Sequence, residues 1–241
     1  MTGSLEWHTE LTMHDAPGSR RDFVKQAGRA ASAAALGSTL APALATAAEP
    51  AAAPATGWDL SWLARLKPAT DRAVFDWPSL GNPADPIMLE LAERYLANCA
   101  TAYGAQRYDA RIVINIRTQA VPAALDDAMW QKLGLGVEYK TQDPATGQPA
   151  ERNPFWYRAP DPAPGVTLPS LGGLQAGGAI ILVCDFALTN LAKRLAAKAG
   201  VTADELHTTL RAHLVRGAYA VPSGIFGLAR AQNAGCALVH V

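Results

Sequence analysis

Ala179-Ile180-Ile181-Leu182-Val183 is the clearest buried strand that the sequence predicts. An apolar run this continuous is typical of a strand that is covered on both faces, as in a parallel sheet. The strand brings Cys184 and Asp185 to its carboxyl end, and residues 186–199 then show the apolar spacing of a helix. A buried strand followed at once by a helix is the repeating unit of α/β proteins, so this stretch sets the expected fold class.

The same alternation extends through most of the chain. We predict further strands at 72–77, 110–117, 218–221 and 236–241, and further helices at 86–103, 122–133, 202–214 and 225–234. Thr202 and Glu205 form a capping box at the start of one helix, and three others end at Gly104, Gly134 and Gly235. We therefore expect a three-layer α/β/α sandwich with a mostly parallel, five-stranded sheet and right-handed crossovers.

The N-terminal region carries Ser19-Arg20-Arg21-Asp22-Phe23-Val24-Lys25, then an alanine-rich stretch that ends in Ala45-Thr46-Ala47. This order is typical of a bacterial twin-arginine signal peptide, here residues 1–47, although an arginine pair before an ordinary surface helix is the alternative. The apolar part is too short and too weakly apolar to span a bilayer, so we expect no stable membrane anchor. We expect the twin-arginine translocase to export the protein to the periplasm.

Composition narrows the classes of partner. The chain has 21 Lys and Arg against 21 Asp and Glu, so its formal net charge is zero and nothing favours binding to nucleic acid. We predict a Pro- and Ala-rich tether at 48–71 that ends in a short amphipathic turn packed on the domain. The domain itself is expected at 72–241. No dinucleotide or phosphate-loop motif is present, so no cofactor is expected.

Three cysteines are present, which is an odd number for an exported protein, so at least one is free unless two chains pair. Cys99 continues an apolar stripe with Ile87, Leu91, Tyr95 and Leu96, which predicts a core position. Cys236 opens the last predicted strand and is expected to be structural. His207 and His213 lie on opposite faces of one predicted helix, which favours solvated side chains and no metal site.

A Pro-rich insertion at about 136–170 interrupts the α/β pattern and contains Phe155-Trp156-Tyr157. A connection of this length without its own structure is uncommon in a compact domain and is often a lid or a binding loop. An insertion without a function is the alternative. Trp156 is therefore a candidate binding residue.

Ligands of open α/β sheets bind beyond the carboxyl ends of the strands. This rule points to four places, which are Asp76 with Trp77, Arg117 to Gln119, Cys184 with Asp185, and Ser223 with Gly224. Cys184 is the leading candidate because a helix N-terminus stabilises a thiolate, although a small buried apolar residue is the alternative. Asp185 opposes the thiolate unless its side chain turns away, and Arg117 could offset it. Ser223 and Gly224 form either an anion-binding turn or a plain tight turn.

The segments Ile180 to Cys184, Val221 to Ile225 and Ala229 to Cys236 resemble the DsrE/DsrF-like family, and the likeness covers roughly 72–241. Exported members share the Arg-Asn-Pro-Phe-Trp stretch found here at 152–156. The resemblance implies a parallel five-stranded sheet, frequent homo-oligomers, and persulfide sulfur on a cysteine that matches Cys184 by position. The chain departs from the family in its long insertion and in lacking a second cysteine beside Cys184.

Two functions follow as hypotheses. In the first, Cys184 carries persulfide sulfur between a small sulfur compound and a thiol-bearing protein, and Arg117 stabilises the developing negative charge. In the second, the protein is a non-catalytic binding module of the periplasm. Its Trp156 loop then folds over the strand ends around a ligand, and Cys184 is only part of the wall.

Overall fold

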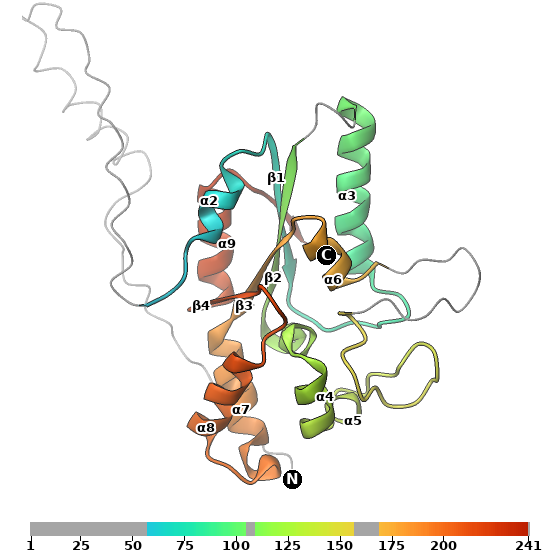
Figure 1. Cartoon of the computed structure of the whole chain (residues 1–241), viewed down its shortest axis with the longest axis vertical. Coiled ribbons are helices and arrows are strands. Elements are labelled where there is room, and N and C mark those ends of the chain that lie inside the picture. Colours follow the sequence, from blue (N-terminus) through green and yellow to red (C-terminus); the bar gives the residue numbers. More distant parts are fainter. Residues whose placement is uncertain (1–56, 105–108, 157–168, 241) are drawn as a thin grey trace, which may run out of the picture. The chain divides into compact units, whose positions relative to one another are not determined.

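The structure is a computed structural model that describes residues 57–104, 109–156 and 169–240. These residues contain a five-stranded, all-parallel sheet with the strand order β4-β3-β2-β1-β5 (Figure 1). Its strands are β1 Asp71–Trp77, β2 Ala110–Ile116, β3 Ile180–Cys184, β4 Tyr219–Val221 and β5 Ala237–His240. The predicted fold class and sheet are therefore confirmed.

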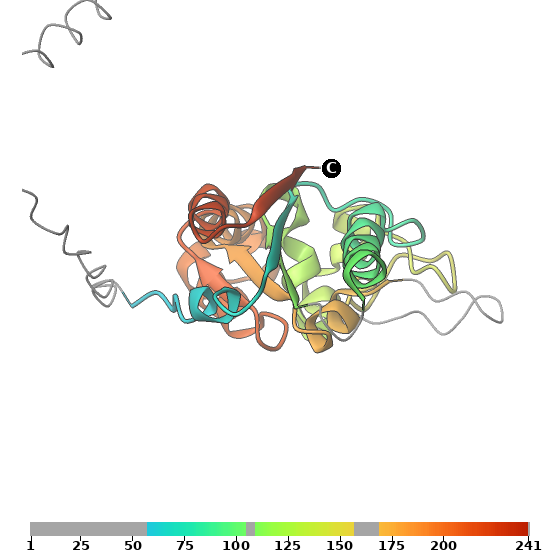
Figure 2. The same ribbon diagram turned by 90° about the horizontal axis from the view of Figure 1, so that it is seen from above.

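Helices cover both faces of the sheet. Seen from above, α2 and α9 lie on one side and α3 and α6 on the other (Figure 2). The principal helices are α2 Trp62–Leu66, α3 Ile87–Tyr103, α4 Asp127–Leu133, α6 Leu171–Ala176, α7 Asp185–Ala199, α8 Ala203–Ala212 and α9 Gly224–Asn233. Because side chains alternate along a strand, each face of the sheet has its own core.

The two cores share β3 between them. Ile181 and Val183 pack into the larger core, while Ile180 and Leu182 pack into the smaller core beneath α2 and α9. The whole strand is buried, as the continuous apolar run predicts.

Two predicted helical features are wrong. Residues predicted to begin a helix at 122 belong instead to a 3-10 helix, Thr118–Ala124, and α4 begins only after Asp126, whose side chain accepts the Met129 N–H. In α3, the predicted stripe does not face the core as a whole, since Ile87 is 52% exposed and Cys99 is only half-buried. The fully buried residues of α3 all belong to its first two turns, so the rest of the helix is less covered.

The amphipathic turn predicted to pack on the domain at the end of the tether is the helix α2, and it is part of the folded unit. Trp62 and Leu66 of α2 are fully buried in the smaller core. The guanidinium of Arg211 lies 4.9 Å from the ring centroid of Trp58, within the range of a cation–π contact. The folded unit therefore begins well before residue 72. The predicted signal peptide lies outside the described residues.

The described part of the insertion is held to the domain by Asn153. The side-chain amide of Asn153 donates to the carbonyls of Ala123 and Leu125 at 2.8 and 2.7 Å. Phe155 is buried and packs edge-on against Trp77, with ring centroids 5.6 Å apart. The insertion also contains the short helix α5, Leu135–Glu138. Tyr157 and the segment 158–168 lie outside the described residues.

Candidate functional site

The carboxyl edge of the sheet gathers polar side chains from neighbouring strands. Asp76 of β1 pairs in register with Asn115 of β2, and Arg117 follows directly after β2. Side-chain alternation puts Asn115 and Arg117 on the face that carries α9. The site therefore depends on parallel pairing, which brings the ends of distant segments together.

Arg117 and Asp76 form a two-point ion pair. Arg117 donates from Nε and from Nη2 to the two carboxylate oxygens of Asp76, each at 2.7 Å. The carboxylate is buried, whereas 27% of the Arg117 side chain is exposed. These hydrogen bonds are the main cause that raises the pKa of Arg117; burial opposes the rise, and the charges of Asp76 and of Cys184 as a thiolate add to it. Because Ile116 of β2 pairs with Val183 of β3, Arg117 and Cys184 lie at the ends of adjacent strands.

Asn115 completes the buried part of this group. Its side-chain Nδ2 donates to Asp76 at 3.4 Å, and it is fully buried. Its Oδ1 is buried without a hydrogen-bond partner in the described residues. His240 approaches from β5, with Nδ1 3.5 Å from the second carboxylate oxygen of Asp76. Asp76 is therefore the shared centre of three side chains.

Two glycines let α9 approach these side chains closely. A Cβ at Gly224 would lie 2.6 Å from the Cβ of Arg117, and a Cβ at Gly227 would lie 2.6 Å from Oδ1 of Asn115. Any larger residue would require the neighbouring side chain to move. Gly224 is thus a packing partner of Arg117, which is a role that sequence reasoning did not assign to it.

Cys184 ends β3 and caps α7. Its Sγ accepts the backbone N–H of Ala187 at 3.3 Å, so the sulfur lies at the N-terminus of a 15-residue helix. The residue is only 5% exposed. The sequence-predicted placement of Cys184 at a strand–helix junction is therefore found, and the thiol is nearly closed off from solvent.

The carboxylate of Asp185 pairs with two side chains of α8. Its Oδ1 lies 3.0 Å from Nε2 of His207 and 3.4 Å from Nη1 of Arg211, both on α8. The two histidines predicted to be solvated keep 24% and 38% of their side chains exposed, but each has an acidic partner: His207 has Asp185, and Nδ1 of His213 lies 2.8 Å from Asp126. Histidines on opposite faces of a helix can each meet a different neighbouring element.

The remaining predicted residues have structural contacts. Ser223 caps α9 by accepting the N–H of Phe226 at 3.2 Å. Trp156 contacts the start of α6, where its carbonyl accepts the N–H of Gly172 and its ring lies beside that glycine. The structure thus brings Arg117, Cys184 and the turn at 223–224 to one edge of the sheet but leaves Trp156 out.

Sequence reasoning missed Asn115 and His240 and gave Asp76 no role. The available signal was a single amide inside the run Ile114-Asn115-Ile116, because a polar side chain in a strand covered on both faces requires a polar partner. His240 carried no signal, since only the pairing of β5 with β1 brings it to Asp76.

Within the described ranges, no three His, Cys, Asp or Glu side chains lie close enough to hold a metal ion. None of the helices described is long and apolar enough to cross a membrane.

No protein-family model matches the sequence, and a search of curated proteins finds no match. Among solved structures, the chain is similar to a protein of unknown function from Methanobacterium thermoautotrophicum, with a TM-score of 0.36 and 14% identity. The alignment covers 71% of this chain and 99% of that one. A likeness this low carries no argument about function, so the proposals below rest on this chain's own residues.

Proposed function

We propose that the protein carries sulfur as a persulfide on Cys184. The observation that carries this proposal is the position of the sulfur, which accepts the Ala187 N–H at the N-terminus of α7. A helix N-terminus favours negative charge on a thiol, and Arg117 supplies a cation at the end of the neighbouring strand. The same atoms would stabilise Cys184 as attacking and as leaving thiolate.

The proposed chemistry consists of two sulfur exchanges. The Cys184 thiolate attacks the terminal sulfur of a donor persulfide, R–S–SH, so that the donor S–S bond breaks and R–S⁻ leaves. Cys184 now carries the sulfur as Cys–S–SH. A thiolate of the acceptor then attacks this outer sulfur, and Cys184 leaves as a thiolate. The sulfane sulfur keeps its oxidation state in both exchanges, so neither step needs an oxidant or a reductant.

Two contacts support this role. Asp185, which would oppose a neighbouring thiolate, has its carboxylate paired with His207 and Arg211. Arg117 donates from Nε and Nη2 to Asp76, which fixes its guanidinium at the strand end beside that of Cys184.

We further propose that the protein works in the periplasm after twin-arginine export. Export in a folded state would deliver the three thiols in reduced form, and Cys99, Cys184 and Cys236 are all free in the structure. The partners would be a low-molecular-weight persulfide as donor and a thiol-bearing protein as acceptor.

The test is the intact mass of the protein after treatment with glutathione persulfide. Wild type and the matched control Cys99→Ser should each gain the mass of one sulfur atom, whereas Cys184→Ser should not. Uptake of sulfur by Cys184→Ser at the wild-type level would overturn the proposal.

A further inference from the structure

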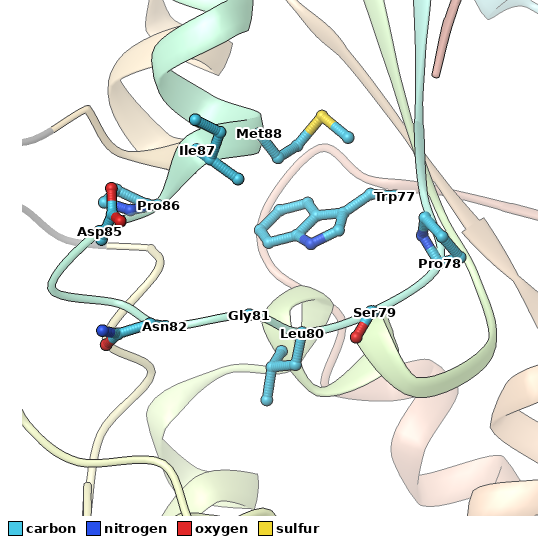
Figure 3. Close-up of a pocket in the computed structure, with 10 residues that line it drawn as sticks. All are labelled: Trp77, Pro78, Ser79, Leu80, Gly81, Asn82, Asp85, Pro86, Ile87 and Met88. Carbon is cyan, nitrogen blue, oxygen red and sulfur yellow. The ribbon is translucent and has the colours of Figure 1, made fainter. Parts of the chain in front are cut away.

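A cavity of about 190 Å³ lies at the carboxyl end of β1, where the chain turns toward α3 (Figure 3). Its lining comes from one stretch of chain, between Trp77 and Met88. None of these residues belongs to the group around Cys184. Ligands of parallel α/β sheets bind at the carboxyl edge of the sheet, so this cavity is a second candidate binding site.

The cavity has a fixed aromatic wall. Figure 3 shows the indole of Trp77 lying across it, and Ile87 and Met88 close the side toward α3. Trp77 as a residue is 3% exposed, and its ring is held by its edge-on contact with Phe155. Packing therefore fixes the orientation of the ring.

The loop that closes the cavity is also held in place. The carbonyl of Pro78 accepts the Thr118 hydroxyl at 2.9 Å and the Gln119 N–H at 3.0 Å. At the far end of the loop, Asn82 accepts the Ala84 N–H in a tight turn. The cavity is thus formed before any ligand arrives, which lowers the entropy cost of binding.

The size of the cavity limits the ligand. An apolar protein cavity of about 150 Å³ holds one benzene molecule. A cavity of about 190 Å³ therefore has room for a single six-membered ring with one small substituent.

Two polar features of the cavity further limit the kind of ligand that it can bind. The Nε1 of Trp77 donates to no acceptor among the described residues, and Figure 3 shows this nitrogen turned toward the loop at Leu80 and Gly81. A bound molecule could accept this N–H. Asp85 is the one ionisable side chain in the described lining, so an anionic ligand would be repelled.

We propose that this cavity binds a neutral, single-ring aromatic molecule whose substituent accepts a hydrogen bond from Nε1 of Trp77. The inference goes beyond sulfur transfer and does not depend on it. Cys184→Ser should therefore bind such a molecule as wild type does.

The test uses phenol, fluorobenzene and benzoate as probes in ligand-observed NMR with the full chain. Phenol should bind most tightly and benzoate most weakly, because the phenol oxygen accepts a hydrogen bond better than the fluorine of fluorobenzene does, and benzoate is anionic. Trp77→Phe keeps an aromatic wall but removes the donor, so phenol should weaken about fivefold and fluorobenzene less than about twofold.

A second variant keeps the test independent of changes in the core. Ile87 is 52% exposed at the cavity, so Ile87→Trp should fill the space and abolish phenol binding without unfolding the protein. Val137→Trp, at a 67% exposed position outside the cavity, is the matched control and should bind phenol normally. Absence of phenol binding to wild type, equal binding by Ile87→Trp, or equal weakening of phenol and fluorobenzene in Trp77→Phe would overturn the proposal.

Discussion

Arg117 forms a bidentate ion pair with the buried carboxylate of Asp76, with both N–O distances at 2.7 Å. The pair joins the ends of β1 and β2, and the pairing of Ile116 with Val183 puts Cys184 at the end of the strand next to that of Arg117. Because Asp76 is 3% exposed, the pair is a buried interaction, and removal of one partner leaves the other charge uncompensated.

We therefore predict that Asp76→Asn destabilises the protein by about 3 kcal/mol in urea unfolding. The matched control is Asp109→Asn, because Asp109 pairs with Arg111 at 3.4 Å on the surface. The Asp109 side chain is 42% exposed and the Arg111 side chain 35% exposed. An exposed pair contributes at most about 1 kcal/mol. Equal effects of the two substitutions would contradict the structural role of the Arg117–Asp76 pair.

Gly227→Ala should destabilise the protein by about 1–3 kcal/mol, because the added Cβ would lie 2.6 Å from Oδ1 of Asn115. Asn115→Ala removes that oxygen, so the same glycine substitution should cost less in the Asn115→Ala background. A double-mutant cycle of unfolding free energies measures this coupling. Additive effects would show that the close approach of α9 to Asn115 is not the reason for the glycine.

The buried thiol of Cys236 should make the stability of the protein depend on pH. Burial raises the pKa of the Cys236 thiol to about 11, and the charge of Arg72 acts in the opposite direction. The unfolded chain loses this proton near its ordinary value of 9.0, so the contribution to stability is complete below that pH and is lost as pH rises through about 11. Urea unfolding between these pH values should show a smaller decline for Cys236→Ala than for wild type. Identical slopes would contradict the assignment.

Residues before the predicted domain boundary should be needed for stability. Trp62 is fully buried, so Trp62→Ala should cost about 3–5 kcal/mol, and the half-buried neighbour in Leu63→Ala should cost less. A chain that begins at residue 57 should unfold at the wild-type denaturant midpoint, whereas one that begins at 72 should not. Equal midpoints for both truncated chains would contradict the inclusion of α2 in the fold.

The strands were the most predictable part of the fold. Continuous apolar runs such as Ile180 to Val183 specify strands covered on both faces, and the spacing between them leaves room only for helical crossovers. The start of α4 was less predictable, because Pro122 is compatible with either an α-helix or a 3-10 helix. The actual choice depends on tertiary contacts, such as the hydrogen bond from the Trp130 indole to the Pro122 carbonyl.

The candidate site was predictable only at the level of strand ends. The rule that ligands bind beyond these ends placed Arg117 and Cys184 on the same edge. It could not show that Arg117 donates two hydrogen bonds to Asp76, because the register between β1 and β2 decides that contact. Nor could it show that Phe155 packs inward against Trp77, because an aromatic cluster in an insertion is compatible with both a lid and an anchor.

The central claim is that Cys184 receives and releases sulfur. The most direct measurement is peptide mapping by mass spectrometry after treatment with a persulfide donor, before and after addition of an acceptor thiol. We predict one added sulfur on the peptide that contains Cys184 and its loss when the acceptor is added. Sulfur found on Cys99 or Cys236 instead, or no adduct on Cys184, would show that Cys184 is not the sulfur carrier.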